Sequence, residues 1–330
     1  MPLAILLGAV VIAVLAFKVS PWPGALLVRT MFNKDDRRVL AALQNHTPAA
    51  PITVLSNQSY LPGNQRALLD VYMPTGIEHT TQTRPVVIWT HGGAWVSGDK
   101  TDDGPYFKLL AAQNVIVVSV NYSLAPEKRY PTQIEEINSA YGYVVANANR
   151  LHINPGKIFI AGDSAGAQLT SQMAAIITDP AYAKEVGITP SLNRSQVAGT
   201  ILFCGIYKME QLVEADPSLP KLLSWGDDQV VWAYSGVSAK TGPLIQQMSP
   251  YYHVTANFPP TFVSGGNADP LTLKQSMPLA SKLQGLGVSV DTLFYPANHR
   301  PSLAHEYQFN LDDNDGQKAL AAVVQFLARH

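Results

Sequence analysis

Short, uninterrupted apolar runs alternate with helical segments along most of this chain. Residues 86–89 and 115–120 consist largely of Val and Ile, which is typical of strands buried on both faces of a sheet. Further strands are expected at residues 52–55, 67–72, 157–161, 197–203, 261–264 and 288–294, and helices at residues 134–148, 165–177, 271–286 and 316–328. Strands that alternate with helices pair in parallel through crossover connections. The sequence therefore predicts the α/β class, with a mostly parallel central sheet and helices on both faces.

One segment interrupts this alternation. Residues 207–258 are rich in Trp, Tyr, Pro and Gln and show little strand pattern, so we expect an inserted cap or lid there. Ahead of the first strand, apolar residues between Ala25 and Leu43 recur at spacings of four or eight, which predicts one or two short amphipathic helices within residues 18–50. The main domain accordingly extends over residues 51–330.

The first seventeen residues are a separate feature. Residues 1–17 contain no charged side chain, and a helix of this length reaches about 25 Å, just short of a hydrocarbon core of ~30 Å. Lys18, Trp22 and Arg29 follow as expected interfacial anchors. We expect an uncleaved helix that associates the protein with a membrane, on a side that the sequence leaves open. A cleaved signal segment followed by export is the alternative, because residues 14–16 (Val-Leu-Ala) form a tolerable cleavage site.

Charge and cysteine content exclude several classes of function. With 23 Lys+Arg against 24 Asp+Glu the net charge is −1, whereas a nucleic-acid groove needs a clustered surplus of basic residues. The single cysteine, Cys204, excludes an intrachain disulfide and a cysteine-based zinc cluster. A zincin-like pattern begins at His305 and Glu306 but fails because position 309 is Phe. The sequence also contains no P-loop or dinucleotide fingerprint.

The chemically most informative motif is Gly162-Asp163-Ser164-Ala165-Gly166. It fits G-x-S-x-G, follows an apolar strand directly and precedes a helical stretch. A nucleophile elbow requires a strand, a sharp turn and a helix. The small residues Gly162 and Gly166 let the backbone turn without side-chain clash. We therefore expect Ser164 at the carboxyl edge of the sheet as a nucleophile.

A second motif, His91-Gly92-Gly93-Ala94-Trp95, also follows a strand. Acyl transfer builds negative charge on a former carbonyl oxygen, and preorganised backbone N–H groups stabilise that charge. The amides of Gly92 and Gly93, with that of Ala165 after the nucleophile, are the expected oxyanion donors. His91 is expected to orient the loop and not to transfer protons.

A serine hydroxyl needs a base to take its proton, and the base needs a carboxylate to fix its tautomer. In enzymes built around such a nucleophile elbow, the serine comes first in the sequence, then the acid, then the histidine. Asp269 follows a strand directly and is the preferred acid. Both His299 and His305 come after the last predicted strand. We prefer His305 because it lies shortly before the last helix, and His299 stays open.

Taken together, HGGAW (91–95), NYSLAPEKRYP (121–131), GDSAGA (162–167), GGNADPL (265–271) and the late histidine resemble the hormone-sensitive lipase-like branch of α/β-hydrolase esterases. The resemblance implies an α/β-hydrolase fold and hydrolysis of carboxylic esters with small to medium acyl chains. It also implies Ser164, Asp269 and His305 as the triad, with no metal and no cofactor. Two departures stand out: Ser123 replaces the usual arginine after Tyr122, and HEYQF (305–309) replaces the usual His-Gly-Phe ending.

Three questions remain open at this level. Trp95, Trp225, Trp232 and Tyr234 are candidates to line a substrate pocket, or else belong to ordinary lid packing. An arylformamidase-type amide hydrolase shares the HGG-x-W and G-x-S-x-G patterns and is the alternative enzyme. A catalytically dead, membrane-tethered interaction module is the alternative without activity. The expected partners are a small ester substrate and a membrane, and the sequence does not determine the oligomeric state.

Overall fold

The computed structural model describes residues 15–212 and 221–330, and all eight predicted strands are confirmed in it. The strands are β1 (Ile52–Ser59), β2 (Leu68–Pro74), β3 (Arg84–Thr90), β4 (Ile116–Val120), β5 (Ile153–Asp163), β6 (Val197–Phe203), β7 (Thr261–Gly265) and β8 (Val290–Phe294). They form one sheet in the order β1-β2-β4-β3-β5-β6-β7-β8. The pairings of β2 with β1 and with β4 are antiparallel, and every later pairing is parallel.

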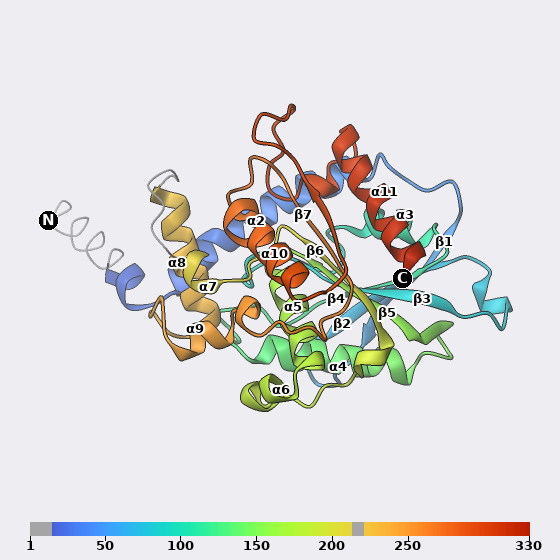
Figure 1. Cartoon of the computed structure of the whole chain (residues 1–330), viewed down its shortest axis with the longest axis horizontal. Coiled ribbons are helices and arrows are strands. Elements are labelled where there is room, and N and C mark those ends of the chain that lie inside the picture. The colour runs from blue at the N-terminus through green and yellow to red at the C-terminus, as the bar shows by residue number, and fades with distance from the viewer. Residues whose placement is uncertain (1–14, 213–220) are drawn as a thin grey trace, which may run out of the picture.

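Helices cover both faces of this sheet (Figure 1). They are α2 (Trp22–Leu43), α3 (Gly104–Ala111), α4 (Thr132–Ala146), α5 (Ser164–Thr178), α6 (Pro180–Val186), α7 (Met209–Leu212), α8 (Lys221–Ser235), α9 (Pro243–Gln247), α10 (Met277–Gly285) and α11 (Asn314–Arg329). One apolar core joins the sheet to α4, α5 and α10, and a second joins the opposite face to α3 and α11. The predicted helix over 271–286 begins as a π-helical turn (Thr272–Ser276) before α10, and the sequence reading missed α3 and α6.

The residues ahead of the sheet form one long helix, α2, in place of the one or two short helices expected. Its first turn contains Pro23, a position where proline costs no helical hydrogen bond. The expected anchor at residues 1–17 lies almost wholly outside the described residues. Within the ranges that the structure does describe, we find no helix with the length and apolar character needed to cross a membrane.

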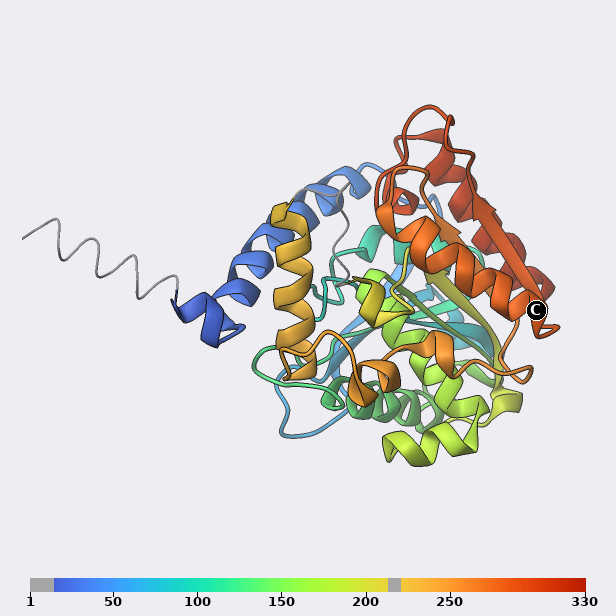
Figure 2. The ribbon, with the colours of Figure 1, turned by 60° about the vertical axis from the view of Figure 1, so that its left-hand side comes forward.

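The described residues of the 207–258 segment lie with α2 above the carboxyl edge of the sheet. Among its described residues this segment forms α7, α8, α9 and a 3₁₀ turn (Pro250–Tyr252), and no strand. Helix α8 packs along α2, as the blue and gold helices of Figure 2 show. Arg29 fastens α2 to the body of the protein, because its guanidinium donates to the carbonyls of Val96 and Ala125 and pairs with Glu127.

The core beneath α11 generates a stability prediction. Phe326 is fully buried, with ring centroids 6.0 Å from Phe159 and 6.2 Å from Phe262. We expect Phe326→Ala to lower the free energy of unfolding by about 3–5 kcal/mol, through lost burial and the cavity left behind. Urea denaturation followed by circular dichroism measures this change. Gln325→Ala, at an exposed position of the same helix, is the matched control, and equal midpoints for the two variants would contradict the prediction.

Candidate active site

The nucleophile elbow is built by a close backbone approach between β5, α5 and the end of β3. Strand β5 ends at Asp163 and α5 begins at Ser164, which has a φ of 48°. A Cβ on Gly166 would stand 2.0 Å from the Thr90 carbonyl oxygen, and one on Gly162 would stand 2.5 Å from the Gly166 backbone. Only glycine fits at these two positions. The positive φ of Ser164 is local strain of the kind found where a fold over-determines a functional residue.

The structure brings together the three residues proposed as a triad. His305 Nε2 lies 3.0 Å from Ser164 Oγ, and His305 Nδ1 lies 3.0 Å from Asp269 Oδ2. With neutral imidazole, the serine hydroxyl donates to Nε2 and Nδ1–H donates to the carboxylate. The Asp269 side chain is fully buried, and its other oxygen accepts the N–H of Leu271. The acid therefore also caps the turn that follows β7.

The other candidate histidine is held elsewhere. His299 Nε2 lies 2.6 Å from Asp315 Oδ2, at the start of α11. Burial acts to raise the pKa of Asp315, but hydrogen bonds from Lys318 and His299 outweigh it and lower that pKa. The structure thus places His305, and not His299, against Ser164.

The electrostatic surroundings of His305 favour charge on the imidazole. Burial opposes that charge, but the charge and the hydrogen bond of the Asp269 carboxylate raise the pKa of His305 above its ordinary value. Burial raises the pKa of the Cys204 thiol to about 11, so this thiol is neutral at pH 7. Asp269 is consequently the charged neighbour that stabilises the imidazolium formed when the base accepts a proton.

The expected oxyanion loop contains two residues with a left-handed backbone conformation. Gly93 has a φ of 90° and Ala94 one of 49°. The Asp163 carboxylate lies close to Gly92, because a Cβ on Gly92 would stand 2.2 Å from Asp163 Oδ2. The amide of Ala165, in the first turn of α5, has no acceptor within its own helix. The assignment of the Gly92, Gly93 and Ala165 amides as oxyanion donors stays a prediction.

His91 supports this loop from behind, as its sequence position indicated. Its ring stacks on Tyr122 with centroids 4.4 Å apart, and its Nδ1 lies 2.9 Å from the Gly92 carbonyl oxygen. Burial lowers the pKa of His91 to about 4. The ring is therefore neutral at pH 7 and positions the loop.

Two cavities open at Ser164. The first has a volume of about 320 Å³ and is lined mainly by apolar side chains of the oxyanion loop, α7 and α8, among them Trp95, Leu212 and Val230. The second has a volume of about 560 Å³ and lies between α2 and residues 302–310. Of the tryptophans proposed as pocket residues, Trp95 lines the first cavity. Trp225 packs on Phe17 and Trp232 lines a separate hollow beside Asp228, so neither contributes to these walls.

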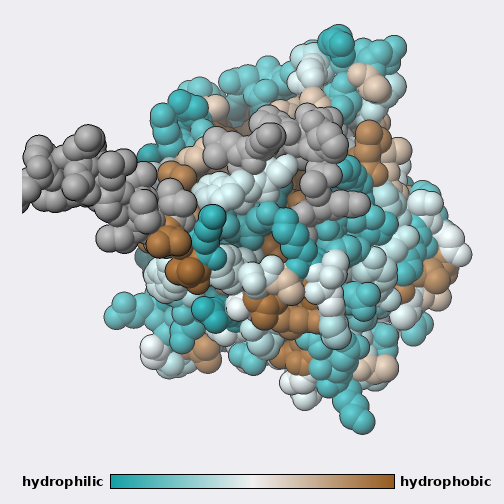
Figure 3. All heavy atoms as spheres, turned by 90° about the vertical axis from the view of Figure 1, so that its left-hand side faces the viewer, coloured by the Kyte–Doolittle hydropathy of each residue, from teal (hydrophilic) through white to brown (hydrophobic). Residues whose placement is uncertain are grey.

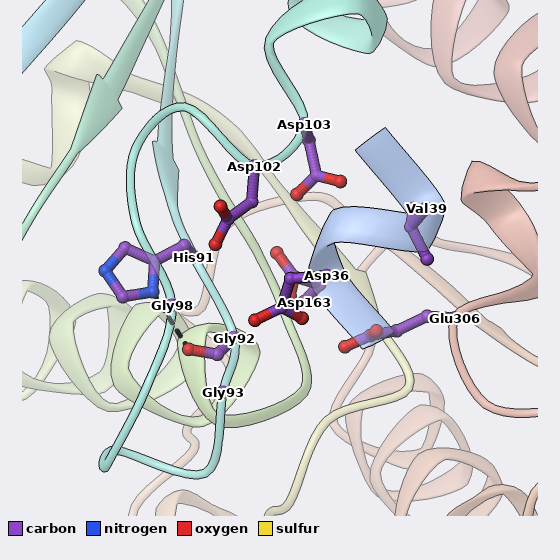
Figure 4. Close-up of a pocket in the computed structure, with 10 residues that line it drawn as sticks. All are labelled: Asp36, Val39, His91, Gly92, Gly93, Gly98, Asp102, Asp103, Asp163 and Glu306. Carbon is purple, nitrogen blue, oxygen red and sulfur yellow. Dashed lines mark hydrogen bonds between the residues drawn. The ribbon is translucent and has the colours of Figure 1, made fainter. Parts of the chain in front are cut away.

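A narrow pocket behind the oxyanion loop contains several acidic side chains that sequence reasoning missed. Asp36, Asp102, Asp103, Asp163 and Glu306 face it from four separate segments of the chain (Figure 4). Burial, reinforced by the neighbouring carboxylates, raises the pKa of Asp36 to about 7. Asp163 is held by the indole N–H of Trp89, 2.7 Å away. No single segment contains enough of these carboxylates to reveal the arrangement from the sequence. The one signal was Glu306, which stands where the resembling family usually has glycine after the late histidine.

One group among the described residues has the composition of a metal site. Cys204, His305 and Glu306 each place a ligand atom within 4.8 Å of the others. Both nitrogens of His305 already contact Ser164 and Asp269, and the thiol is protonated at neutral pH. The arrangement is therefore suited to nucleophilic catalysis by serine.

Comparison with known proteins agrees with this geometry. A protein-family model called BD-FAE matches residues 69–283, more than half of the chain. Esterase LipC from Mycobacterium tuberculosis is 29% identical over 61% of this chain and 48% of its own length. Carboxylesterase NlhH from the same organism is 28% identical over 68% of this chain and 66% of its own length. The chain thus spans less than two thirds of the length of either relative.

Among solved structures, esterase B from Lactobacillus rhamnosis has a similar fold. It superposes with a TM-score of 0.77 over 93% of this chain and 95% of its own, at 20% sequence identity. This likeness concerns the fold.

The elbow generates a prediction that needs no substrate. We expect Gly166→Ala to lower the free energy of unfolding by about 1–3 kcal/mol or more, because the added methyl group would overlap backbone atoms that cannot move independently. The matched control is Gly156→Ala, where the new Cβ would meet only Asn154 Oδ1, at 3.4 Å. Chemical denaturation compares them, and a Gly166→Ala protein as stable as the control would show that the elbow is not packed as described.

Proposed function

The chain belongs to the BD-FAE family of α/β-hydrolases, and we propose that it is a serine esterase that hydrolyses carboxylic esters through an acyl-enzyme. The observation that carries this proposal is the continuous hydrogen-bonded chain from Ser164 through His305 to Asp269. Supporting it are the elbow beneath the serine, the strained loop beside it and the two cavities that meet there.

The geometry defines each step of the proposed reaction. Ser164 Oγ attacks the ester carbonyl carbon while His305 Nε2 accepts its proton, and Asp269 stabilises the resulting imidazolium. The amides of Gly92, Gly93 and Ala165 stabilise the negative oxygen of the tetrahedral intermediate. The imidazolium then protonates the departing alcohol, which leaves the acyl group on the serine. Water, deprotonated by the same imidazole, releases the acid and regenerates the enzyme.

The first cavity fits the acyl half of such a substrate. Its walls are mostly apolar and include Trp95, Ile206, Leu212 and Val230. A volume of about 320 Å³ accommodates a small to medium acyl chain. Trp95 is fixed in place, because its ring stacks on Tyr234 at 4.8 Å and its N–H donates to Gln168.

The proposal predicts which substitutions abolish turnover. With p-nitrophenyl acetate, butyrate and octanoate as substrates, we expect Ser164→Ala and His305→Ala each to reduce kcat by several orders of magnitude, about 10⁴-fold or more. His299→Ala retains the triad and is the matched histidine control. Ester turnover by Ser164→Ala equal to that of the wild type would refute the proposal. Faster turnover of N-formyl aromatic amides than of esters would instead indicate an amidase.

We also propose that the start of α2 and the residues before it lie against a lipid membrane. Six large apolar side chains between residues 15 and 31 are exposed: Leu15, Val19, Trp22, Leu26, Leu27 and Met31. They make up more than half of the exposed large hydrophobic residues in the described part of the chain. Figure 3 views this end of the molecule, where apolar surface gathers. In the sequence the patch continues directly from fourteen uncharged residues, and exposed apolar side chains with an interfacial tryptophan are typical of membrane-surface helices.

A vesicle experiment tests this placement. We expect the full chain to float with phosphatidylcholine–phosphatidylglycerol vesicles, and Leu26→Asp to weaken partitioning by about tenfold through lost apolar burial and added negative charge. Leu273→Asp removes a leucine that is 75% exposed outside the patch and is the matched control. Equal partitioning of the two variants would contradict the membrane role of α2.

A further inference from the structure

The two cavities that meet at Ser164 differ in chemical character, and the difference bears on which alcohol the proposed esterase releases. The first is lined mainly by apolar side chains, and its charged members outside the triad are one of each sign, Asp227 and Lys274. The second has four carboxylates in its walls, those of Asp35, Asp36, Glu306 and Asp313. Its single guanidinium, that of Arg38, is paired with Asp35 at 3.2 Å. The second cavity therefore has a surplus of negative charge beside the nucleophile.

Glu306 lies nearest to the reacting atoms. Its Oε1 is 3.6 Å from His305 Nε2, on the side of the imidazole that faces Ser164. The same oxygen lies 3.2 Å from the position that a Cβ on Gly92 would occupy, so the carboxylate stands against the oxyanion loop. A negative group at this place opposes the build-up of negative charge on the substrate oxygen. Hydrolysis of a neutral ester is slowed by Glu306 unless something positive compensates it.

The reaction geometry decides which half of the substrate meets this carboxylate. The departing alcohol oxygen receives its proton from His305 Nε2, so it must come within hydrogen-bond distance of that atom. Glu306 Oε1 lies beside the same nitrogen, and residues 302–310 form the adjoining wall of the second cavity. The alcohol half consequently extends into the second cavity, while the acyl half occupies the apolar one.

The second cavity also has aromatic residues in its walls. Phe32 of α2 is partly exposed there, and the largely buried Tyr307 and Phe309 lie beneath it. Aromatic faces combined with a carboxylate bind quaternary ammonium groups well, because such cations are weakly hydrated and attracted by the ring quadrupole. Crowding of negative charge here is also reflected in Asp36, whose pKa is raised to about 7 by burial and then by neighbouring carboxylates that include Glu306.

We propose that Glu306 is a specificity-determining residue that selects esters whose alcohol half bears a positive charge, a quaternary ammonium group of the choline type being the best fit. The inference rests on the proposed esterase function. It follows from the carboxylate beside His305, the aromatic walls and the position of the departing alcohol. The compensating charge comes from the substrate itself, so the enzyme discriminates against neutral alcohols of the same shape.

A pair of esters with matched shape tests the inference. Butyrylcholine and 3,3-dimethylbutyl butyrate share the acyl group and differ in having nitrogen or carbon at the quaternary centre, so only the charge changes. We expect wild-type kcat/KM for butyrylcholine to exceed that for the neutral ester by at least about tenfold. Glu306→Gln, which keeps the side-chain size, should reduce this ratio by at least about fivefold.

Two further variants guard against trivial explanations. Glu306 has a φ of 59°, so Glu306→Gly removes the carboxylate and suits the backbone, and it should lower the ratio as Glu306→Gln does. Glu135→Gln makes the same charge change at an exposed position of α4, away from both cavities, and should leave the ratio as in the wild type. Thermal melting of each variant verifies folding.

The possible outcomes separate this inference from the proposed function. A wild-type ratio near one, with both esters hydrolysed, would overturn the inference and leave the esterase proposal standing. A high ratio that survives both Glu306 substitutions would overturn the role of Glu306. Hydrolysis of p-nitrophenyl butyrate but of neither test ester would also refute the inference. Failure to hydrolyse any ester would refute both.

Discussion

The structure depends on how closely the backbone of the nucleophile elbow approaches the end of β3. Gly166 packs so tightly against the Thr90 carbonyl that no side chain fits between them. This contact fixes the start of α5 relative to the loop that follows β3. Since the serine belongs to α5 and the oxyanion donors to that loop and to α5, one backbone contact sets the distance between attacking oxygen and stabilising amides. Misplacement by about 1 Å at such a site can cost about two orders of magnitude in rate.

The parallel sheet explains why residues far apart in the sequence meet at this point. Ser164, Asp269 and His305 follow β5, β7 and β8, and the carboxyl ends of parallel strands lie at one edge of the sheet. Each strand therefore delivers its following loop to the same region. Strands β1 and β2 lie beyond β4, at the side of the sheet farthest from β7 and β8, and carry none of the triad residues.

Most of the fold and the central residues of the site could be predicted from the sequence because they leave local signals. Buried parallel strands are continuous apolar runs, and the elbow needs its glycines at fixed spacing. The choice between His299 and His305 could not be made locally, since it depends on Asp315, which holds His299 at the start of α11. The approach of the Asp163 side chain to Gly92 could not be predicted either, because the two residues follow different strands. Trp225 and Trp232 were candidates by composition alone, and helix packing directed them elsewhere. The walls supplied by α2 had no sequence signal, because a helix pattern does not reveal what the helix packs against.

Helix α2 connects the exposed apolar end of the molecule to the cavities beside Ser164. At one end its exposed apolar residues face outward, and further along Phe32 and Asp36 form walls of the substrate cavities. Between them, the Arg29 guanidinium donates hydrogen bonds to the carbonyls of Val96 and Ala125, next to the oxyanion loop. A displacement of this helix would therefore also move the carbonyl groups that Arg29 holds beside the oxyanion loop. The position of α2 and the shape of that loop are linked through a single side chain.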